Sequence, residues 1–227
     1  MFDEYHYFNC VESTNLTALD YPVYHVVWAG EQTAGRGRLG RKWLSEKGNL
    51  FMSAVLPFSK NAPFYSLIAS VAVAEALKRF HPTLKWPNDV LIEGKKVCGI
   101  LLEASDDKLI LGIGVNILSA PEEKVLYPTT CLKAHGKAPA RENLLREITA
   151  ALEKEIKTFD KDGFDSVRQK WLSLSTGVGK EIEVHLPSQT IKGIFKTISP
   201  AGELILENKG EKITVTAGDV FLGKKND

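Results

Sequence analysis

The sequence predicts an α/β (α+β) fold, with helices flanking a sheet, followed by a small unit made only of strands. Short β-branched and aromatic runs alternate with two longer stretches, residues 62–80 and 141–159, whose apolar residues recur at helical spacing. After Ser175-Thr-Gly-Val-Gly179 the composition shifts, and short β-rich segments alternate with glycine-containing turns. We therefore expect a larger domain over residues 1–176 and an accessory SH3-like β-barrel over residues 180–227.

The same patterns predict the elements in chain order. Strands of the larger domain are expected at residues 4–10, 23–28, 49–56, 83–86, 90–92, 96–103 and 108–115. Helix N-cap residues at 12–15 precede a short helix that ends near Asp20, and further helices are expected at 62–80, 141–159 and 164–172. Residues 116–140 are expected to form a long loop, and such loops are often functional lids. Strands of the C-terminal unit are expected at 181–186, 190–198, 203–206, 212–215 and 219–222.

Bulk composition limits the function classes. The net charge of the 227 residues is +1, so no global field recruits nucleic acid and any anion must be bound locally. No apolar run approaches the ~20 residues of a membrane span, and the acidic, aromatic N-terminus lacks the pattern of a signal peptide. Three cysteines without C-x-x-C spacing fit a reducing compartment. These features predict a cytoplasmic protein that has no membrane partner.

A glycine-rich basic loop is the most informative stretch. Residues 33–43 read TAGRGRLGRKW and contain G-x-G-x-x-G, the spelling of a dinucleotide-binding fingerprint. That interpretation requires a helix that opens within the motif, but residues 41–48 have no apolar face at helical spacing and residues 49–56 resemble a strand. Glycines that let a ligand approach, and arginines that fork toward phosphate or carboxylate, predict an anion-binding loop instead. A solvated basic loop is the plain alternative.

Three further motifs suggest a nucleotide site when they are taken together. KWPND (residues 85–89) offers an amide and a carboxylate at a turn. Lys96 opens the strand expected at residues 96–103. GIGVN (residues 112–116) ends a strand with two glycines. Read singly, the first is an ordinary Pro-Asn turn and the lysine a solvated strand residue. Combined with the loop, they supply cations for a triphosphate and a carboxylate for Mg²⁺.

The motifs GRGRLGRKW, KWPNDV, KKVCGILLE and GIGVN, in this order, resemble the biotin protein ligase (biotin–[acetyl-CoA-carboxylase] ligase) family. The resemblance implies a mixed sheet like that of class II aminoacyl-tRNA synthetases. It also implies a reaction in two steps. Biotin and MgATP give biotinyl-5′-AMP and pyrophosphate, and a lysine of a biotin carboxyl carrier domain then takes the biotin.

Matched residue by residue, the resemblance also implies roles for side chains. Lys96 and Arg38 are the expected catalytic residues, and Asp89 is the expected ligand of Mg²⁺. The expected ATP-binding residues are Arg38, Arg41, Trp43, Asn88, Lys96 and Asn116. The expected biotin-binding residues are Ser13, Thr14, Asn15, Gln32, Gly35, Arg36, Lys96, Gly99, Leu101, Gly112 and Gly114. Gly30 departs from the family pattern, which commonly has a glutamate there.

The resemblance extends to partners and leaves alternatives. It implies a homodimer whose protein partner is the carrier domain of a carboxylase. The first strand begins within a few residues of Met1, so we expect a ligase-only form that has no N-terminal DNA-binding domain and binds no DNA. The runner-up is a lipoate or octanoyl transferase of the same superfamily, which lacks the GRGR-x-GR loop. A nucleic-acid-binding module that uses the basic loop is the alternative from a different class.

Overall fold

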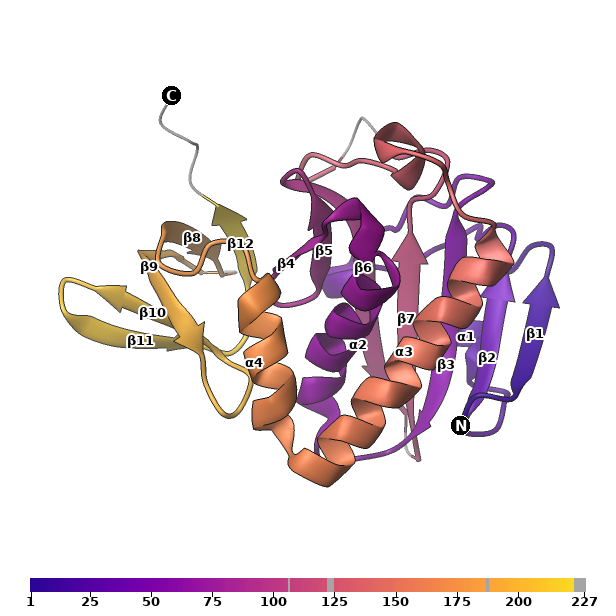
Figure 1. Ribbon diagram of the computed structural model, residues 1–227, viewed down its shortest axis with the longest axis horizontal. Helices are drawn as coiled ribbons and strands as arrows, with labels where there is room; N and C mark the ends of the chain where they lie inside the picture. The colour runs from indigo at the N-terminus through magenta and orange to yellow at the C-terminus, as the bar shows by residue number, and fades with distance from the viewer. Residues whose placement is uncertain (106, 122–124, 187, 223–227) are drawn as a thin grey trace.

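The computed structural model describes residues 1–105, 107–121, 125–186 and 188–222. Its larger sheet has seven strands in the order β1-β2-β3-β7-β6-β5-β4 (Figure 1). These strands are β1 (Glu4–Phe8), β2 (His25–Ala29), β3 (Leu50–Pro57), β4 (Thr83–Lys85), β5 (Asp89–Ile92), β6 (Lys95–Ala104) and β7 (Lys108–Val115). Only β1 and β2 run parallel, and the other neighbours are antiparallel. The predicted mixed sheet is confirmed.

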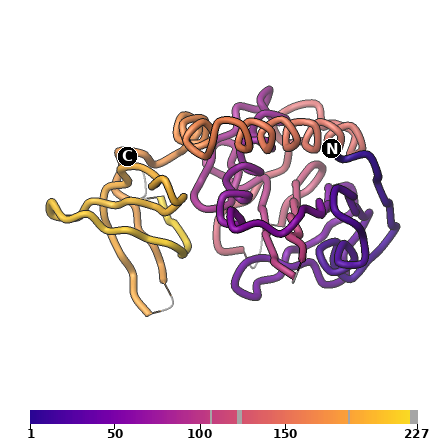
Figure 2. The backbone as a smooth tube through the Cα atoms, turned by 90° about the horizontal axis from the view of Figure 1, so that it is seen from below, coloured from indigo at the N-terminus to yellow at the C-terminus, as the bar shows by residue number. Residues whose placement is uncertain are grey.

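Helices cover both faces of this sheet, but unequally. The long helices α2 (Ala62–Ala76), α3 (Arg141–Asp162) and α4 (Phe164–Leu174) gather on one face, where α2 packs against the other two (Figures 1 and 2). The short α1 (Thr14–Ala18) packs on β2, β3 and β7, where Ala18 joins Val27, Val55 and Ile110 in a separate small core. Short 3₁₀ turns are η1 (Arg38–Gly40), η2 (Lys78–Phe80) and η3 (Leu132–His135).

The sequence explains why α2 lies at the centre of the main core. Residues 67–74 of this helix are all buried, which makes it apolar around most of its circumference. Such a helix needs partners on several sides, and it has the sheet beneath it and α3 and α4 beside it. The expected helix 62–80 is interrupted after Ala76 and continues as η2. Ser13 holds the N-cap position of α1, but its side chain makes no capping hydrogen bond.

The C-terminal unit is a five-stranded antiparallel sheet in the order β11-β10-β9-β8-β12. Its strands are β8 (Glu181–His185), β9 (Thr190–Ile198), β10 (Leu204–Asn208), β11 (Glu211–Val215) and β12 (Asp219–Leu222). Within the described residues β11 and β12 form its two edges, so hydrogen bonds do not close it into a complete barrel. The predicted fold class is confirmed. None of the helices that the structure describes is long and apolar enough to cross a membrane.

The two sheets are joined through α4. The Trp171 indole is fully buried, donates a hydrogen bond to Ser70 Oγ on α2 (3.0 Å) and meets the ring of Phe195 on β9 with centroids 6.5 Å apart. One turn earlier, Arg168 donates to the Ile198 carbonyl at 2.6 Å. A single face of α4 therefore ties the C-terminal sheet to the main helical layer.

Trp171→Ala should destabilise the whole chain, because it leaves a large cavity at this junction. Truncation of a buried aromatic residue typically costs about 3–5 kcal/mol, and we expect that loss in the free energy of unfolding measured with urea. Ser173→Ala, an exposed change on the same helix, should stay within about 0.5 kcal/mol of the original protein. Equal stability of the two variants would contradict the role given to Trp171.

Candidate active site

The glycine-rich loop is a small ribbon that pairs with itself. Trp43 N–H donates to the Gly35 carbonyl (2.9 Å) and Gly37 N–H to the Arg41 carbonyl (2.7 Å), while Arg36 and Lys42 form an antiparallel bridge. The tip turns through Leu39, whose φ of 56° is left-handed and whose side chain is 70% exposed. A bulky residue in this conformation is strained. The ribbon therefore presents its basic side chains along a stem that is paired by hydrogen bonds.

Two glycines that face each other make a flat floor under this ribbon. Gly99 on β6 lies opposite Gly114 on β7, and a Cβ atom on either would stand 2.6–2.7 Å from ring atoms of Trp43. No real side chain tolerates such a contact, so both positions must be glycine for the indole to lie on the sheet. The Lys96 ammonium lies 5.4 Å from the centre of the indole. The contact with the Trp43 indole therefore explains why Gly114 stands near the end of β7.

One end of the site is neutral and rich in hydrogen bonds. Gln32 Oε1 accepts from Thr14 N–H at 2.8 Å, and Ser53 Oγ lies 2.8 Å from Thr14 Oγ1 and 2.6 Å from Asn15 Oδ1. Asn15 rests on Gly112, where a Cβ atom would come within 2.3 Å of Oδ1. Thr14, Asn15 and Ser53 are at most 5% exposed. Polar groups so deeply buried are costly unless they are paired, and here they pair with one another.

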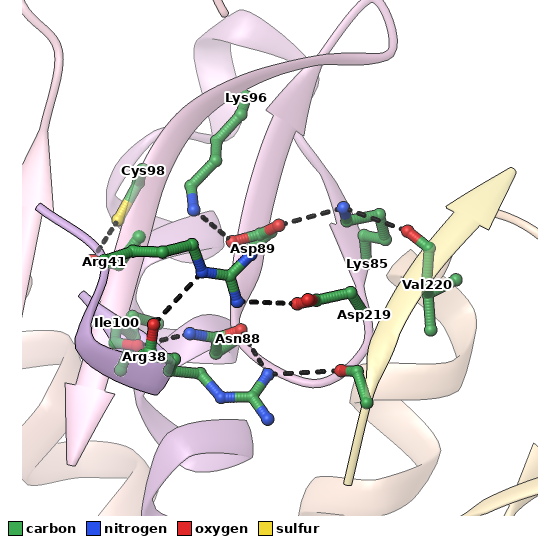
Figure 3. Close-up of polar contacts among 12 residues, drawn as sticks. Arg38, Arg41, Lys85, Asn88, Asp89, Lys96, Cys98, Ile100, Asp219 and Val220 are labelled. Carbon is green, nitrogen blue, oxygen red and sulfur yellow. Dashed lines mark hydrogen bonds and ion pairs between the residues drawn. The ribbon is translucent and has the colours of Figure 1, made fainter. Parts of the chain in front are cut away.

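The other end is cationic and is organised by Asp89. Its carboxylate is buried, with Lys96 Nζ at 2.6 Å from one oxygen and Lys85 Nζ at 3.0 Å from the other (Figure 3). Burial alone would raise the pKa of the Asp89 carboxyl, but the two ammonium groups outweigh it and hold the pKa below its ordinary value. Burial lowers the pKa of Lys85, which also donates to the Val220 carbonyl at 3.3 Å. Asp89 thus fixes Lys96 at the edge of the cavity.

The C-terminal sheet reaches this cationic end through the start of β12. Arg41 is paired with Asp219 (2.7 Å), and Arg38 donates to Asn88 Oδ1 (3.3 Å) and lies within 3.5 Å of the Gly218 carbonyl (Figure 3). Burial lowers the pKa of Arg38. Burial also acts to lower the pKa of Arg41, but the ion pair with Asp219 outweighs this effect and raises the pKa of Arg41 above its ordinary value. The expectation that this unit is merely accessory is therefore wrong, because it supplies a wall of the site.

These groups surround a cavity of about 380 Å³, a volume within the range of small-molecule sites. Every predicted site residue lines it except Gly35, which lies in the loop stem, where a Cβ atom would meet the Trp43 carbonyl at 2.5 Å. Gly112 and Gly114 of β7, and Asn116 just after its end, lie at alternate positions and line the cavity. At about 3.3 Å per residue they span about 13 Å, from the neutral end past Trp43 to Asn116.

Two buried polar atoms in this cavity have no partner among the described residues, namely Asn116 Oδ1 and Trp43 Nε1. Asn116 is anchored by its amide nitrogen, which donates to the Thr130 carbonyl at 3.1 Å, so its oxygen cannot turn away. An unpaired acceptor of this kind is costly unless a ligand satisfies it. The two atoms mark places where a bound molecule would accept or donate a hydrogen bond.

Sequence reasoning missed several residues of the site. Asp219 and Tyr127 line the cavity; the Tyr127 ring lies over Lys85 Nζ (3.2 Å) and beside Phe221 of β12. These contacts join residues far apart in the chain, so no local spacing could reveal them. Glu103 pairs with Arg36 at 2.8 Å. Because Glu103 is the last residue of the motif KKVCGILLE, the sequence could have pointed to it. At Gly30, the Tyr7 hydroxyl occupies the space that a side chain would need.

Comparisons with known protein families and solved structures show the general class to which this chain belongs. The family described as "Biotin/lipoate A/B protein ligase family" matches residues 7–117. The family described as "Biotin protein ligase C terminal domain" matches residues 177–223. A solved structure of a biotin protein ligase from Aquifex aeolicus in complex with biotin and ATP superposes with a TM-score of 0.88 and 32% identity, covering 98% of this chain and 99% of that one.

Two relatives narrow the assignment. The biotin–[acetyl-CoA-carboxylase] ligase of Paracoccus denitrificans is 34% identical over 87% of this chain and 90% of that protein. The bifunctional ligase/repressor BirA of Bacillus subtilis (strain 168) is 33% identical over 96% of this chain and 73% of that protein. The chain belongs to the biotin protein ligase family.

Asp219→Ala should loosen the ribbon without unfolding the protein. The Arg41–Asp219 pair is partly exposed, and such pairs contribute at most about 1 kcal/mol. We therefore expect amide hydrogen exchange at residues 37–42 to become about two- to fivefold faster in the ligand-free protein. Glu183→Gln removes a surface pair with Lys192 on the same C-terminal sheet and should leave that exchange unchanged. If the Asp219 variant also matched the original protein, the tether between β12 and the ribbon would be disproved.

Proposed function

We propose that this protein is an ATP-dependent biotin protein ligase, which forms biotinyl-5′-AMP and transfers the biotin to one lysine of a biotin carboxyl carrier domain. One observation carries the proposal: a single cavity joins the neutral, hydrogen-bonding end at Thr14 and Gln32 to the cationic end at Lys96, Arg38 and Arg41. Biotin has a neutral ureido ring at one end and a carboxylate at the other. The matching polarity of cavity and ligand supports this assignment.

In the first step the biotin carboxylate attacks the α-phosphorus of ATP and pyrophosphate leaves. Lys96 would lie between the two anions and stabilise the negative charge that grows on the α-phosphate oxygens. Arg38 would present its fork to the carboxylate and the phosphate. Because Asp89 already holds Lys96 in place, little reorganisation would be needed when the reactants arrive.

The nucleotide base fits the far end of the cavity. Asn116 Oδ1 is an acceptor that has no partner among the described residues, and the exocyclic amine of adenine is a donor. Arg41 would meet the phosphates, which must then compete with Asp219 for its guanidinium. Trp43 would separate the biotin chain from the nucleotide while it lies on the glycine floor.

In the second step the ε-amine of the carrier lysine attacks the acyl carbonyl carbon of biotinyl-5′-AMP, the acyl–phosphate bond breaks and AMP leaves. The carrier must therefore bring a lysine to the mouth of the cavity, beneath the ribbon. The glycine-rich loop would retain the mixed anhydride until that lysine arrives. A homodimer in the cytoplasm is part of the same proposal, and the three free cysteines fit a reducing compartment.

Magnesium fits this site only together with the nucleotide. The described residues contain no group of three or more His, Cys, Asp or Glu side chains that could hold a metal, and both Asp89 oxygens are paired with lysines. Mg²⁺ is commonly bound by one or two carboxylates plus substrate phosphates. Asp89 would be the protein's contribution to an ion that neutralises phosphate charge.

An exchange assay tests the function. Purified protein with ATP and labelled pyrophosphate should incorporate the label into ATP when biotin is added, and not when lipoate replaces biotin. Lipoate is the informative competitor because the family described for residues 7–117 includes lipoate ligases. Transfer of biotin to a carrier domain should follow. Exchange with lipoate alone would support the runner-up activity and refute the biotin ligase proposal.

Lys96→Met should abolish adenylate formation while biotin still binds. Loss of one preorganised donor to a transition state typically costs ~10²–10³-fold in rate. Because Lys96 also pairs with the buried Asp89 carboxylate, the melting temperature should fall as well. Lys85→Met is the matched comparison, since it removes the other ammonium from Asp89. That variant should lose a similar amount of melting temperature but much less rate, because both lysines pair with Asp89. An inactive Lys85 variant beside a nearly normal Lys96 variant would reverse the assignment of the catalytic lysine.

A further inference from the structure

Glu103 lies outside the cavity but ends a chain of hydrogen bonds that begins inside it. The carboxylate has one oxygen on Arg36 Nη2 (2.8 Å) and accepts from Asn15 Nδ2 with the other (2.7 Å). Asn15 Oδ1 lies 2.6 Å from Ser53 Oγ, and Ser53 Oγ lies 2.8 Å from Thr14 Oγ1. Thr14 and Asn15 line the cavity, whereas Glu103 does not.

The charge of Glu103 determines the direction of every bond in this chain. A carboxylate only accepts, so the Asn15 amide must turn its NH₂ group toward Glu103 and its oxygen toward Ser53. The single hydroxyl hydrogen of Ser53 is then used on Asn15 Oδ1. The close contact between Ser53 and Thr14 must therefore take its hydrogen from Thr14.

This direction leaves acceptors, not donors, for a ligand. Thr14 Oγ1 keeps both lone pairs when its hydrogen points to Ser53, and Gln32 Oε1 needs to accept only from Thr14 N–H (2.8 Å). In the opposite direction Ser53 would donate to Thr14, and Thr14 would donate to Gln32 Oε1, which lies 3.1 Å away. That arrangement would consume one acceptor position on each of Thr14 and Gln32.

We propose that Glu103 is a positioning residue for substrate specificity: through Asn15 and Ser53 it keeps Thr14 and Gln32 available as acceptors for the N–H groups of a cyclic urea. The inference rests on the proposed function, because the cyclic urea is the ureido ring of biotin. Arg36 completes the device. It holds one carboxylate oxygen, so the other oxygen stays on Asn15.

Glu103→Gln reverses the chain without changing its shape. The Arg36 cation selects the amide oxygen of the new glutamine, which leaves its NH₂ group facing Asn15. Asn15 must then flip, and each later hydrogen bond flips with it. We expect the KM for biotin in the pyrophosphate exchange assay to rise about tenfold, the effect of one lost hydrogen bond. The KM for ATP, the kcat and the melting temperature should stay within about twofold or 2 °C of the original values.

A second substitution at Arg36 separates this role from general loosening of the loop. In an Arg36→Gln background the glutamine at position 103 is free to turn its oxygen toward Asn15. Adding Glu103→Gln to that background should therefore raise the KM for biotin less than threefold. Glu31→Gln is the matched control, since Glu31 pairs with Lys47, just beyond the loop (3.5 Å), and makes no hydrogen bond to Asn15 or Ser53 among the described residues. It should leave the KM for biotin unchanged.

Gly112→Ala breaks the chain at another point, because its Cβ atom would displace Asn15. It should raise the KM for biotin selectively, which provides a test if the Glu103 variant folds poorly. An unchanged KM for biotin in Glu103→Gln, or an equal cost in both Arg36 backgrounds, would overturn the inference. Absence of biotin-dependent exchange by the original protein would instead refute the proposed function and is distinguishable from either result.

Discussion

The site depends on one buried carboxylate that cannot remain alone. Asp89 lies at the start of β5, between β4 and β6, with its carboxylate buried, and an unpaired charge there would cost several kcal/mol. It stays ionised because Lys85 and Lys96 approach from opposite sides. Lys85 in turn needs the Val220 carbonyl and the Tyr127 ring to complete its own surroundings. The groups that compensate the charge of Asp89 therefore bring β4, β6, β12 and the segment around Tyr127 into contact with one another.

The same constraint explains why the two sheets meet where they do. The arginines of the ribbon repel one another, and a carboxylate nearby lowers that cost. Asp219 serves Arg41 in this way, and the Gly218 carbonyl lies beside Arg38. The hydrophobic contact through Trp171 fixes the C-terminal sheet on the helices, and electrostatics then orient its last strand toward the cavity.

Local pattern was sufficient to predict most of the fold. Strands and helices were predictable within a few residues because apolar periodicity and turn residues are short-range signals, as α3 and β7 illustrate. The motif residues converge on one cavity because each motif ends a strand or forms a turn at the same side of the sheet. What the resemblance implied about their roles stays a prediction.

The remaining features lie beyond local pattern. The pairing of Arg41 with Asp219 spans 178 residues, and nothing near Asp219 distinguishes it from an ordinary strand residue. The internal pairing of the glycine-rich loop was also missed, because Leu39 in a left-handed conformation contradicts its propensity. Glu103 was within a recognised motif, but its importance depends on Arg36 and Asn15, which come from other parts of the chain.

The position of β12 in the chain has a consequence for biosynthesis. The ribbon, the glycine floor and Lys96 are all translated before the last strand that holds Arg41 and Lys85 in place. A nascent chain that lacks β12 holds these residues without the contacts that Asp219 and Val220 make to Arg41 and Lys85. These contacts of Arg41 and Lys85 are therefore complete only after β12 has been translated and has packed beside them.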